Sequence, residues 1–204
     1  MGQASPLSAT EYVLIQPQTN LAESSTPENI ALLQREVILR AQGEAVELFD
    51  GLLPLSTILT FAAIYDIADE AVFRLLDGRL VLLFDHQPKG TMRSEEVDEI
   101  IWAEILKVKS KGVTVQDICG PKSEVIIDLA SIWSRVREND DIIARTKVFI
   151  KALFGFLEPA VIVRLRGEIP NLPLISAVYL VRPYGHRVIF DDARGNSVNI
   201  FSNI

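Results

Sequence analysis

The stretch Val161-Ile162-Val163-Arg164-Leu165-Arg166 decides the expected fold class, because apolar and basic residues alternate along its second half. Alternation with a period of about 2 is typical of a half-buried β-strand, whereas a period of about 3.6 is typical of an amphipathic helix. The apolar residues before Glu158-Pro159 recur mainly at helical spacing. The hydrophobic period therefore changes from helix to strand at this point of the chain.

Three further segments after Arg166 are expected to be strands: Ile175–Val181, Arg187–Phe190 and Val198–Phe201. Gly, Pro, Asp and Asn residues between them supply turns, and the connections are short. Short connections favour antiparallel neighbours. Residues 160–203 are therefore predicted to form an antiparallel β-meander of about four strands.

Residues 27–158 are predicted to form a helical layer of about five helices, with one buried strand near residues 79–85. Thr26-Pro27-Glu28 is a strong helix start, since Thr caps, Pro suits the first helical position and Glu favours the first turn. Pro54 begins a second helix that is apolar nearly all round. Gly43 ends or weakens the first helix. The remaining long helices are expected over 94–112, 125–136 and 139–156.

The segment from Ala71 to Asp85 allows two interpretations, because Asp77-Gly78 can be a hairpin turn or the end of a short helix. The acidic pair Asp69-Glu70 favours a helix start. A short helix, a stop at Gly78 and a buried strand over Leu80–Phe84 are therefore predicted here.

The chain is expected to consist of an extended arm, residues 1–26, and a single α+β domain, residues 27–204, without internal repeats. The arm is rich in Ser, Thr, Gln, Ala and Pro, and its one apolar segment is Tyr12-Val13-Leu14-Ile15. This segment can add a strand to its own domain or to a neighbouring subunit. Tyr12 and Leu14 are therefore candidate contact residues.

The net charge of −7, from 20 basic and 27 acidic residues, disfavours wholesale nucleic-acid binding without excluding a local basic site. Residues 1–90 hold 5 basic and 12 acidic groups, whereas residues 91–204 hold 15 of each. A chain with one acidic and one neutral half can pair head to tail with itself, although a random surface shows similar asymmetry.

Cys119 is the only cysteine, which excludes an intramolecular disulfide and multi-thiolate metal sites and suggests a reducing, cytoplasmic location. The longest uncharged run, Gly51–Tyr65, is shorter than a bilayer-spanning helix requires, so no transmembrane segment is expected. Pro6 stands where an N-myristoylation signal needs Ser or Thr, which argues against lipidation. The start also lacks the basic region of a secretory signal.

The sequence contains none of the short motifs of dinucleotide, P-loop, zincin, thiol-redox or serine-elbow chemistry. No cofactor and no metal site is therefore predicted. His86 and His186 lie near strand ends, and with Asp85, Asp191 or Asp192 they could form a small hydrolase site if they met in space.

The basic residues of the predicted sheet are all arginines, and Arg164, Arg166 and Arg187 are expected on its outer face. The rigid guanidinium fork suits carboxylate or phosphate groups. This face can bind a partner or an anion, or it can be a solvated face with weak pairs to Asp191 or Asp192.

These observations favour a non-enzymatic assembly or partner-binding protein. It is expected to self-associate, or to bind another protein, through the arm residues Tyr12 and Leu14 and the charged face of Arg164, Arg166 and Arg187. The alternatives are a small hydrolase that uses His and Asp residues at strand ends, and a protein that binds RNA or another anion on the arginine face.

Overall fold

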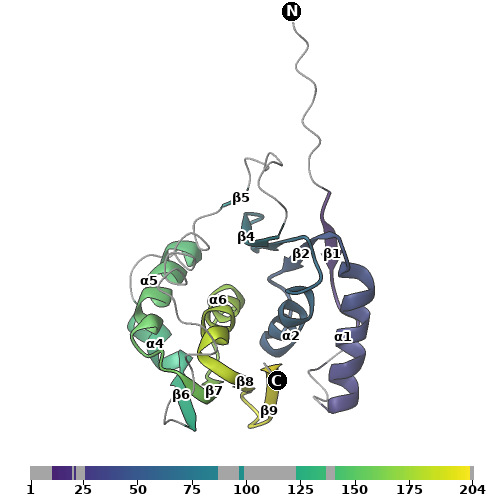
Figure 1. Ribbon diagram of the computed structural model, residues 1–204. Coiled ribbons are helices and arrows are strands. Elements are labelled where there is room, and N and C mark those ends of the chain that lie inside the picture. The colour runs from purple at the N-terminus through teal and green to yellow at the C-terminus, as the bar shows by residue number, and fades with distance from the viewer. Residues whose placement is uncertain are drawn as a thin grey trace, which may run out of the picture.

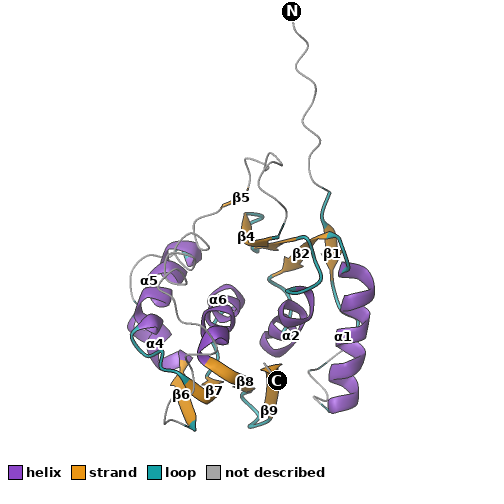
Figure 2. Ribbon diagram, in the orientation of Figure 1, coloured by secondary structure: helices purple, strands orange, loops and turns teal. Residues whose placement is uncertain are grey.

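The computed structural model describes residues 11–19, 21, 26–86, 97–98, 123–136 and 141–202. Two mixed β-sheets lie on opposite sides of a row of helices (Figure 1; Figure 2). Sheet A has the strand order β1-β2-β3-β4-β5, and sheet B has the order β6-β7-β8-β9. Helices and strands alternate along the chain in both parts.

The elements associated with sheet A are β1 (Val13–Ile15), α1 (Pro27–Ala41), β2 (Ala45–Phe49), α2 (Pro54–Ile64), β3 (Glu70–Arg74), β4 (Leu80–Asp85) and β5 (Val97–Asp98). The elements associated with sheet B are β6 (Glu124–Asp128), α4 (Leu129–Arg135), α5 (Ile142–Phe154), β7 (Ala160–Arg166), α6 (Asn171–Val181), the 3-10 turn η2 (Arg182–Tyr184), β8 (Gly185–Asp191) and β9 (Ser197–Ser202).

The two halves of the chain repeat one arrangement, which we call the first unit (residues 13–85) and the second unit (residues 124–202). In each unit three strands run parallel, with helical connections between them, and a hairpin then adds an antiparallel fourth strand. A constant shift of 117 residues superposes the register of β2, β3 and β4 on that of β7, β8 and β9: Val46 pairs with Ala71 as Val163 pairs with Val188. The first strands, β1 and β6, are related by a shift of 112 residues. The structure therefore contains an internal repeat.

The hairpins show the repeat in most detail. The register slips between Ala71 and Val72 in the first unit and between Val188 and Ile189, 117 residues later, in the second. Gly78 and Gly195 occupy the same place in the two turns, with φ of 88° and 82°. Only glycine adopts such backbone angles without strain, which explains why both turns retain it.

The helices α2 and α6 run parallel and in contact at the centre of the molecule. Asn171 at the start of α6 donates a hydrogen bond to the Leu52 carbonyl just before α2, and Tyr179 near the end of α6 contacts Tyr65 at the end of α2. All 11 residues of α6 and most residues of α2 are buried. The two sheets therefore share one continuous hydrophobic core.

The expected fold class was wrong. Helices and strands are interleaved in two mixed sheets, rather than arranged as a helical layer followed by an antiparallel meander. In sheet B, β6, β7 and β8 are parallel, and only β8 and β9 are antiparallel. The short connections misled the prediction because the segment between β7 and β8 is itself a helix.

Three segments form a helix where a strand was predicted, or a strand where a helix was predicted. Ile175–Val181 belongs to the helix α6, Ala71–Arg74 to the strand β3, and Val125–Asp128 to the strand β6. The helix α6 and the centre of β3 are buried on all sides, so their hydrophobic period does not distinguish helix from strand. The strand β6 is partly exposed and runs directly into α4, and the predicted helix extended over both. Asp77-Gly78 forms the turn of a hairpin between β3 and β4, which is the alternative that the sequence analysis did not favour.

The strands predicted over Val161–Arg166, Arg187–Phe190, Val198–Phe201 and Leu80–Phe84 are confirmed, as are the helices that begin at Pro27 and Pro54. The last predicted helix begins at Ile142, with Asp141 as its cap in place of Asn139. Val97–Asp98, within the helix predicted over 94–112, is a strand. The rest of that segment and Cys119 lie outside the described residues.

A substitution at Gly167 tests the close packing between β7 and α4. Gly167 has φ of 95°, and an added Cβ would lie 2.7 Å from the Ala130 Cβ and 2.9 Å from its backbone nitrogen. Gly167→Ala should lower the free energy of unfolding by roughly 3 kcal/mol, from backbone strain and overpacking together. Urea unfolding measures this loss.

Gly195→Ala is the matched control, because φ is 82° there and no atom lies within 4 Å of the added Cβ. Backbone strain alone should cost about 1 kcal/mol. Equal losses in the two variants would show that Ala130 does not crowd Gly167.

Candidate functional site

The parallel arrangement of the two units places the carboxyl ends of their parallel strands on one side of the molecule. The loops 50–53 and 167–170, which precede α2 and α6, meet there through the hydrogen bond from Asn171 Nδ2 to the Leu52 carbonyl, 2.9 Å long. Ligands of open α/β sheets commonly bind outside the carboxyl ends of the strands. We call this side the carboxyl pole; it is the first place where a site is expected.

Asp50 and Asn171 form a partly buried polar pair at the carboxyl pole. Burial raises the pKa of the Asp50 carboxyl, and a hydrogen bond with Asn171 partly opposes that rise. Asn171 is 8% exposed, and its Oδ1 has no hydrogen-bond partner in the part of the chain that the structure describes. This pair links the two units at the helix starts.

A pocket of about 110 Å³ lies between the start of α2, the loop after β7 and the turn after β8. Leucine, proline and phenylalanine side chains line most of it, and Glu168, Asp192 and Arg194 provide its charged groups. The Asp192 carboxylate accepts bonds from the backbone of Arg194 and from Asn196, within its own turn. Small-molecule sites usually enclose at least about 300 Å³, so this pocket is small for one.

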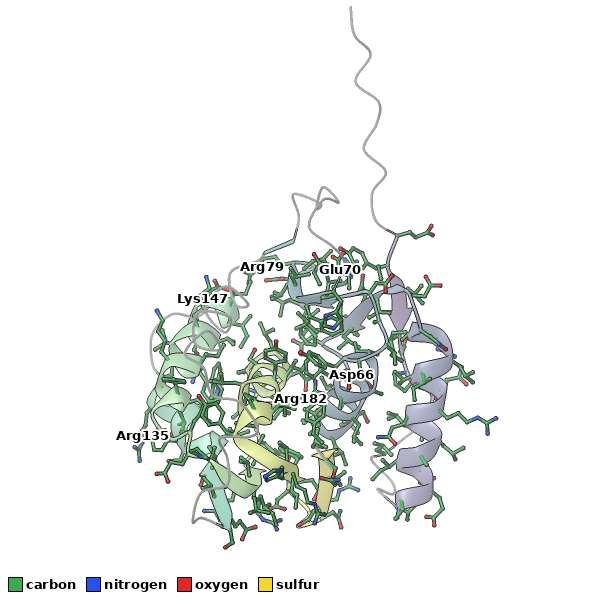
Figure 3. All side chains as sticks on the ribbon, in the orientation of Figure 1. Asp66, Glu70, Arg79, Arg135, Lys147 and Arg182 are labelled. Carbon is green, nitrogen blue, oxygen red and sulfur yellow. The ribbon has the colours of Figure 1, made fainter. Side chains whose placement is uncertain are left out.

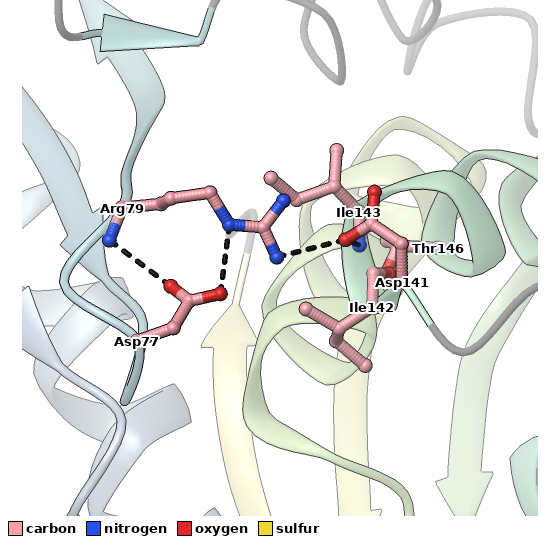
Figure 4. Close-up of polar contacts among 6 residues, drawn as sticks. All are labelled: Asp77, Arg79, Asp141, Ile142, Ile143 and Thr146. Carbon is pink, nitrogen blue, oxygen red and sulfur yellow. Dashed lines mark hydrogen bonds and ion pairs between the residues drawn. The ribbon is translucent and has the colours of Figure 1, made fainter.

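Arg79 joins the two units on the same side of the molecule (Figure 4). Its Nε donates to Asp77 Oδ2 and its Nη2 donates to Asp141 Oδ1, both at 2.8 Å. Asp141 caps α5 by accepting a bond from the Ile143 backbone. The hydrogen bond from Arg79 lowers the Asp141 pKa, and the backbone N–H of Arg79 lowers the Asp77 pKa. Arg79 therefore connects the turn after β3 to the start of α5 through exposed ion pairs.

The structure places the predicted arginines on the outer face of sheet B. Arg164 donates to Glu124 on β6 at 2.9 Å and to Asp191 on β8 at 2.7 Å. Arg166 lies 3.8 Å from Asp128, with its side chain 55% exposed, and Arg187 is also exposed. Arg164 is thus neutralised within the sheet, whereas Arg166 and Arg187 extend into solvent.

The first unit carries the same ion pair with the charges exchanged. Glu47 on β2 and Arg74 on β3 form two hydrogen bonds of 2.6 Å. The shift of 117 residues superposes Glu47 on Arg164 and Arg74 on Asp191. Because an equivalent pair occurs on both outer faces, Arg164 stabilises its sheet and is a weak candidate for binding an external anion.

Leu14 lies in β1, the edge strand of sheet A, and Tyr12 directly precedes this strand. The Tyr12 hydroxyl donates to Glu70 at 2.6 Å, and Leu14, opposite Glu47 in the parallel register, is 47% exposed. Ile15 on the opposite face is buried in the core. The segment Val13–Ile15 therefore adds its strand to its own sheet.

The contacts of His86 lie within the first unit. The His86 ring stacks on Phe84 with a centroid distance of 4.7 Å, and its Nε2 lies 2.8 Å from the Tyr65 carbonyl. No hydrogen bond or ring contact joins His86 to His186. Asp191, one of the three aspartates that the hydrolase hypothesis offers, is bonded to Arg164 and Ser197.

The cluster around His86 also holds Arg182, which Figure 3 labels beside Asp66 where α6 and α2 end. The Arg182 guanidinium lies 4.4 Å from the Tyr65 ring centroid and 4.7 Å from that of Phe201. These contacts tie α2, α6 and β9 together at the pole opposite the loops 50–53 and 167–170.

Among the described residues, no group of three or more His, Cys, Asp and Glu side chains is arranged as metal ligands. The helices within those residues all fall short of the length and hydropathy needed to cross a bilayer.

The outer side of the helix α1 exposes three large apolar side chains, among charged ones, that the sequence analysis missed. Leu32, Ile38 and Leu39 are 55%, 41% and 76% exposed. The opposite face, with Leu33, Val37 and Ala41, is buried. The signal was present in the sequence, because three large apolar residues lie outside the helical stripe that the core uses.

Comparison with models of protein families, with curated proteins and with solved structures finds no match for this chain.

The Arg79 bridge predicts how two carboxyls titrate. In Arg79→Ala, the Asp141 pKa should rise toward its ordinary value, because the side-chain bond that lowers it is lost. The Asp77 pKa should rise less, because alanine retains the backbone N–H that is the main cause of its shift. An NMR titration of the carboxyl carbons measures both values.

The sign of the effect on stability follows from the direction of these shifts. A carboxyl with a lowered pKa stabilises the fold above its unfolded pKa and loses that effect as the pH falls through the folded value. When the pH is lowered, Arg79→Ala should therefore unfold at a higher pH than the wild type does. Asp192, whose partners lie in its own turn, is the internal control. Unchanged Asp141 titration would contradict the bridge.

Proposed function

We propose that this chain is a non-enzymatic assembly protein that self-associates. The observation that carries the proposal is the exposed apolar face of α1, with Leu39 76% and Leu32 55% exposed. Scattered exposed leucines are common on monomers, but several on one helix face mark a contact surface.

The position of α1 supports this proposal. It ends the row of helices between the sheets, where it packs against α2 and β1 (Figure 1). Among the described residues, the large apolar side chains of α2 and α6 are buried in the core, whereas those on the outer side of α1 face solvent. A helix at the end of a layer can extend that layer with a helix from another chain.

The internal pairing of charges also supports a contact surface in preference to a catalytic site. Arg164, Asp191, Asp77 and Asp141 each have a partner within the chain, and Arg182 is held by Asp66 and two rings. A catalytic acid or base needs a reactive group aimed at a substrate-sized space. The apolar face of α1 has the opposite property, since its exposure is unfavourable until another surface covers it.

Light scattering behind a size-exclusion column tests the proposal. The molar mass should rise from 22.7 kDa toward twice that value as the protein concentration increases. It should persist at moderate salt, because burial of apolar surface is not screened by salt. A mass of 22.7 kDa at every concentration that the protein tolerates would contradict self-association.

A truncation distinguishes a role of the N-terminal arm from loss of the fold. Removal of residues 1–10 leaves β1 in place, whereas removal of residues 1–25 also takes Ile15 and Leu21 from the core. The shorter deletion is therefore the informative one. If α1 provides the contact, the molar mass of the associated form should fall only by the mass of the deleted residues.

A further inference from the structure

The pocket at the carboxyl pole combines an apolar lining with an opening to solvent. Leu21, Leu55 and Phe190 line it and are buried, with 4%, 7% and 2% of their surface exposed. Leu53, which also lines it, is 47% exposed. Ligands of open α/β sheets commonly bind at this end of the strands. The pocket therefore offers a small apolar space that solvent can reach.

The volume of the pocket limits what it can bind. The space is about 110 Å³, and a water molecule occupies about 30 Å³ in the liquid, so the pocket takes about four non-hydrogen atoms. A leucine, isoleucine or methionine side chain has this size, whereas a nucleotide or an indole ring is too large. The pocket therefore suits one small apolar group of a ligand whose polar part stays at the opening.

Two opposite charges at the pocket are available to a ligand. Glu168, in the loop after β7, and Arg194, in the turn after β8, contribute a carboxylate and a guanidinium. Both residues are exposed, and within the described part of the chain neither side chain forms a hydrogen bond or an ion pair. The Asp192 carboxylate accepts bonds from the backbone N–H groups of Arg194 and Asn196, at 2.9 and 2.8 Å. Asp192 therefore fixes the turn, whereas Glu168 and Arg194 can contact a ligand.

The internal repeat shows that the fold does not require these two charges. The shift of 117 residues superposes Glu168 on Gly51 and Arg194 on Asp77. Asp77 accepts hydrogen bonds from the backbone and side chain of Arg79, within its own turn. The equivalent place in the first unit therefore has one carboxylate, which is already bonded, and no cation in the place of Arg194.

We propose that this pocket binds a small apolar α-amino acid, with its side chain against Phe190, its carboxylate on Arg194 and its ammonium group on Glu168. The inference is independent of the proposed self-association, because α1 does not line the pocket.

Each part of such a ligand meets a group that suits it. The fork of a guanidinium matches a carboxylate, and a carboxylate accepts hydrogen bonds from an ammonium group. A simple apolar acid would leave Glu168 unpaired, and an apolar amine would leave Arg194 unpaired. A residue inside a peptide carries neither charge. A free amino acid therefore fits this pair of charges better than any of these three.

A titration of the full chain with L-leucine, followed by backbone amide NMR, tests the proposal. Resonances of residues 53–56, 168–169 and 190–196 should shift, with a millimolar affinity because exposed ion pairs contribute little. Isocaproate is leucine without the ammonium group, and isoamylamine is leucine without the carboxylate. Each should bind about fivefold more weakly than L-leucine. L-tryptophan should not bind, because its ring exceeds the volume of the pocket.

Charge substitutions test the two contacts separately. Glu168→Gln and Arg194→Gln should each weaken the affinity for L-leucine about fivefold. Glu44→Gln and Arg135→Gln, outside the pocket, are the matched controls and should bind as the wild type does. All four residues are exposed, so the circular dichroism spectra should not change.

Ala193→Phe tests the pocket itself. Ala193 lines the pocket but is exposed on the turn, so a phenylalanine there can fill the space without entering the core. This variant should lose L-leucine binding and keep its fold.

Four results would overturn the amino-acid site. They are no shift with L-leucine, L-isoleucine or L-methionine, shifts outside the pocket, binding that persists in Ala193→Phe, and equal affinity for L-leucine and either analogue. The molar mass of the associated form should be the same in all these variants, so such a failure would leave the proposed function standing.

Discussion

The packing of α2 against α6 is the constraint on which the rest of the structure depends. Both helices are apolar nearly all round, and every residue of α6 is buried. A fully buried Leu, Ile, Val or Phe side chain contributes about 1.5–3 kcal/mol relative to exposure, so neither helix could face water. Each helix instead packs against the other, while one sheet covers the row of helices on each side.

The parallel direction of α2 and α6 has consequences for the whole molecule. It places equivalent loops of the two units together at one pole, where Asn171 bonds to the Leu52 carbonyl, and places Tyr65 and Tyr179 together at the other. It leaves α1 at one end of the row with its outer side uncovered among the described residues. The proposed contact of α1 with a second copy therefore follows from how the two units share their central helices.

The outer faces of the sheets show how the repeated units have diverged. Glu47 with Arg74 and Arg164 with Asp191 occupy equivalent positions with the charges exchanged. Both pairs are partly buried, and each pair neutralises both of its members. Of the three arginines that the sequence suggested for partner binding, Arg164 is thus neutralised within the chain, whereas Arg166 and Arg187 extend into solvent.

The sequence predicted most directly the elements with one polar side, whereas a segment without a polar side, such as Ile175–Val181, fits either a helix or a strand. The helix from Pro27 and the strand with Arg164 and Arg166 were predictable, because polar residues mark their solvent faces. Ile175–Val181 was not, because it is buried on every side. The repeat was hidden because most equivalent positions, such as Glu47 and Arg164, differ, and its evidence is strand register, which only the structure provides.

The candidate surface could have been found in part. Leu32 and Leu39 are visible in the sequence as apolar residues outside the core stripe, but their exposure depends on which helix ends the row. Arg164, by contrast, resembled a binding residue because its partners Glu124 and Asp191 come from other strands. Both the exposure of the α1 leucines and the pairing of Arg164 depend on contacts between segments that are distant in the sequence.

Hydrogen–deuterium exchange of the full chain at low and high protein concentration tests most directly whether α1 is the surface through which copies associate. The account predicts slower exchange at high concentration in residues 31–42, with the outer face of sheet B unchanged. Slower exchange confined to β6 and β7, or identical exchange throughout the chain at the two concentrations, would contradict it.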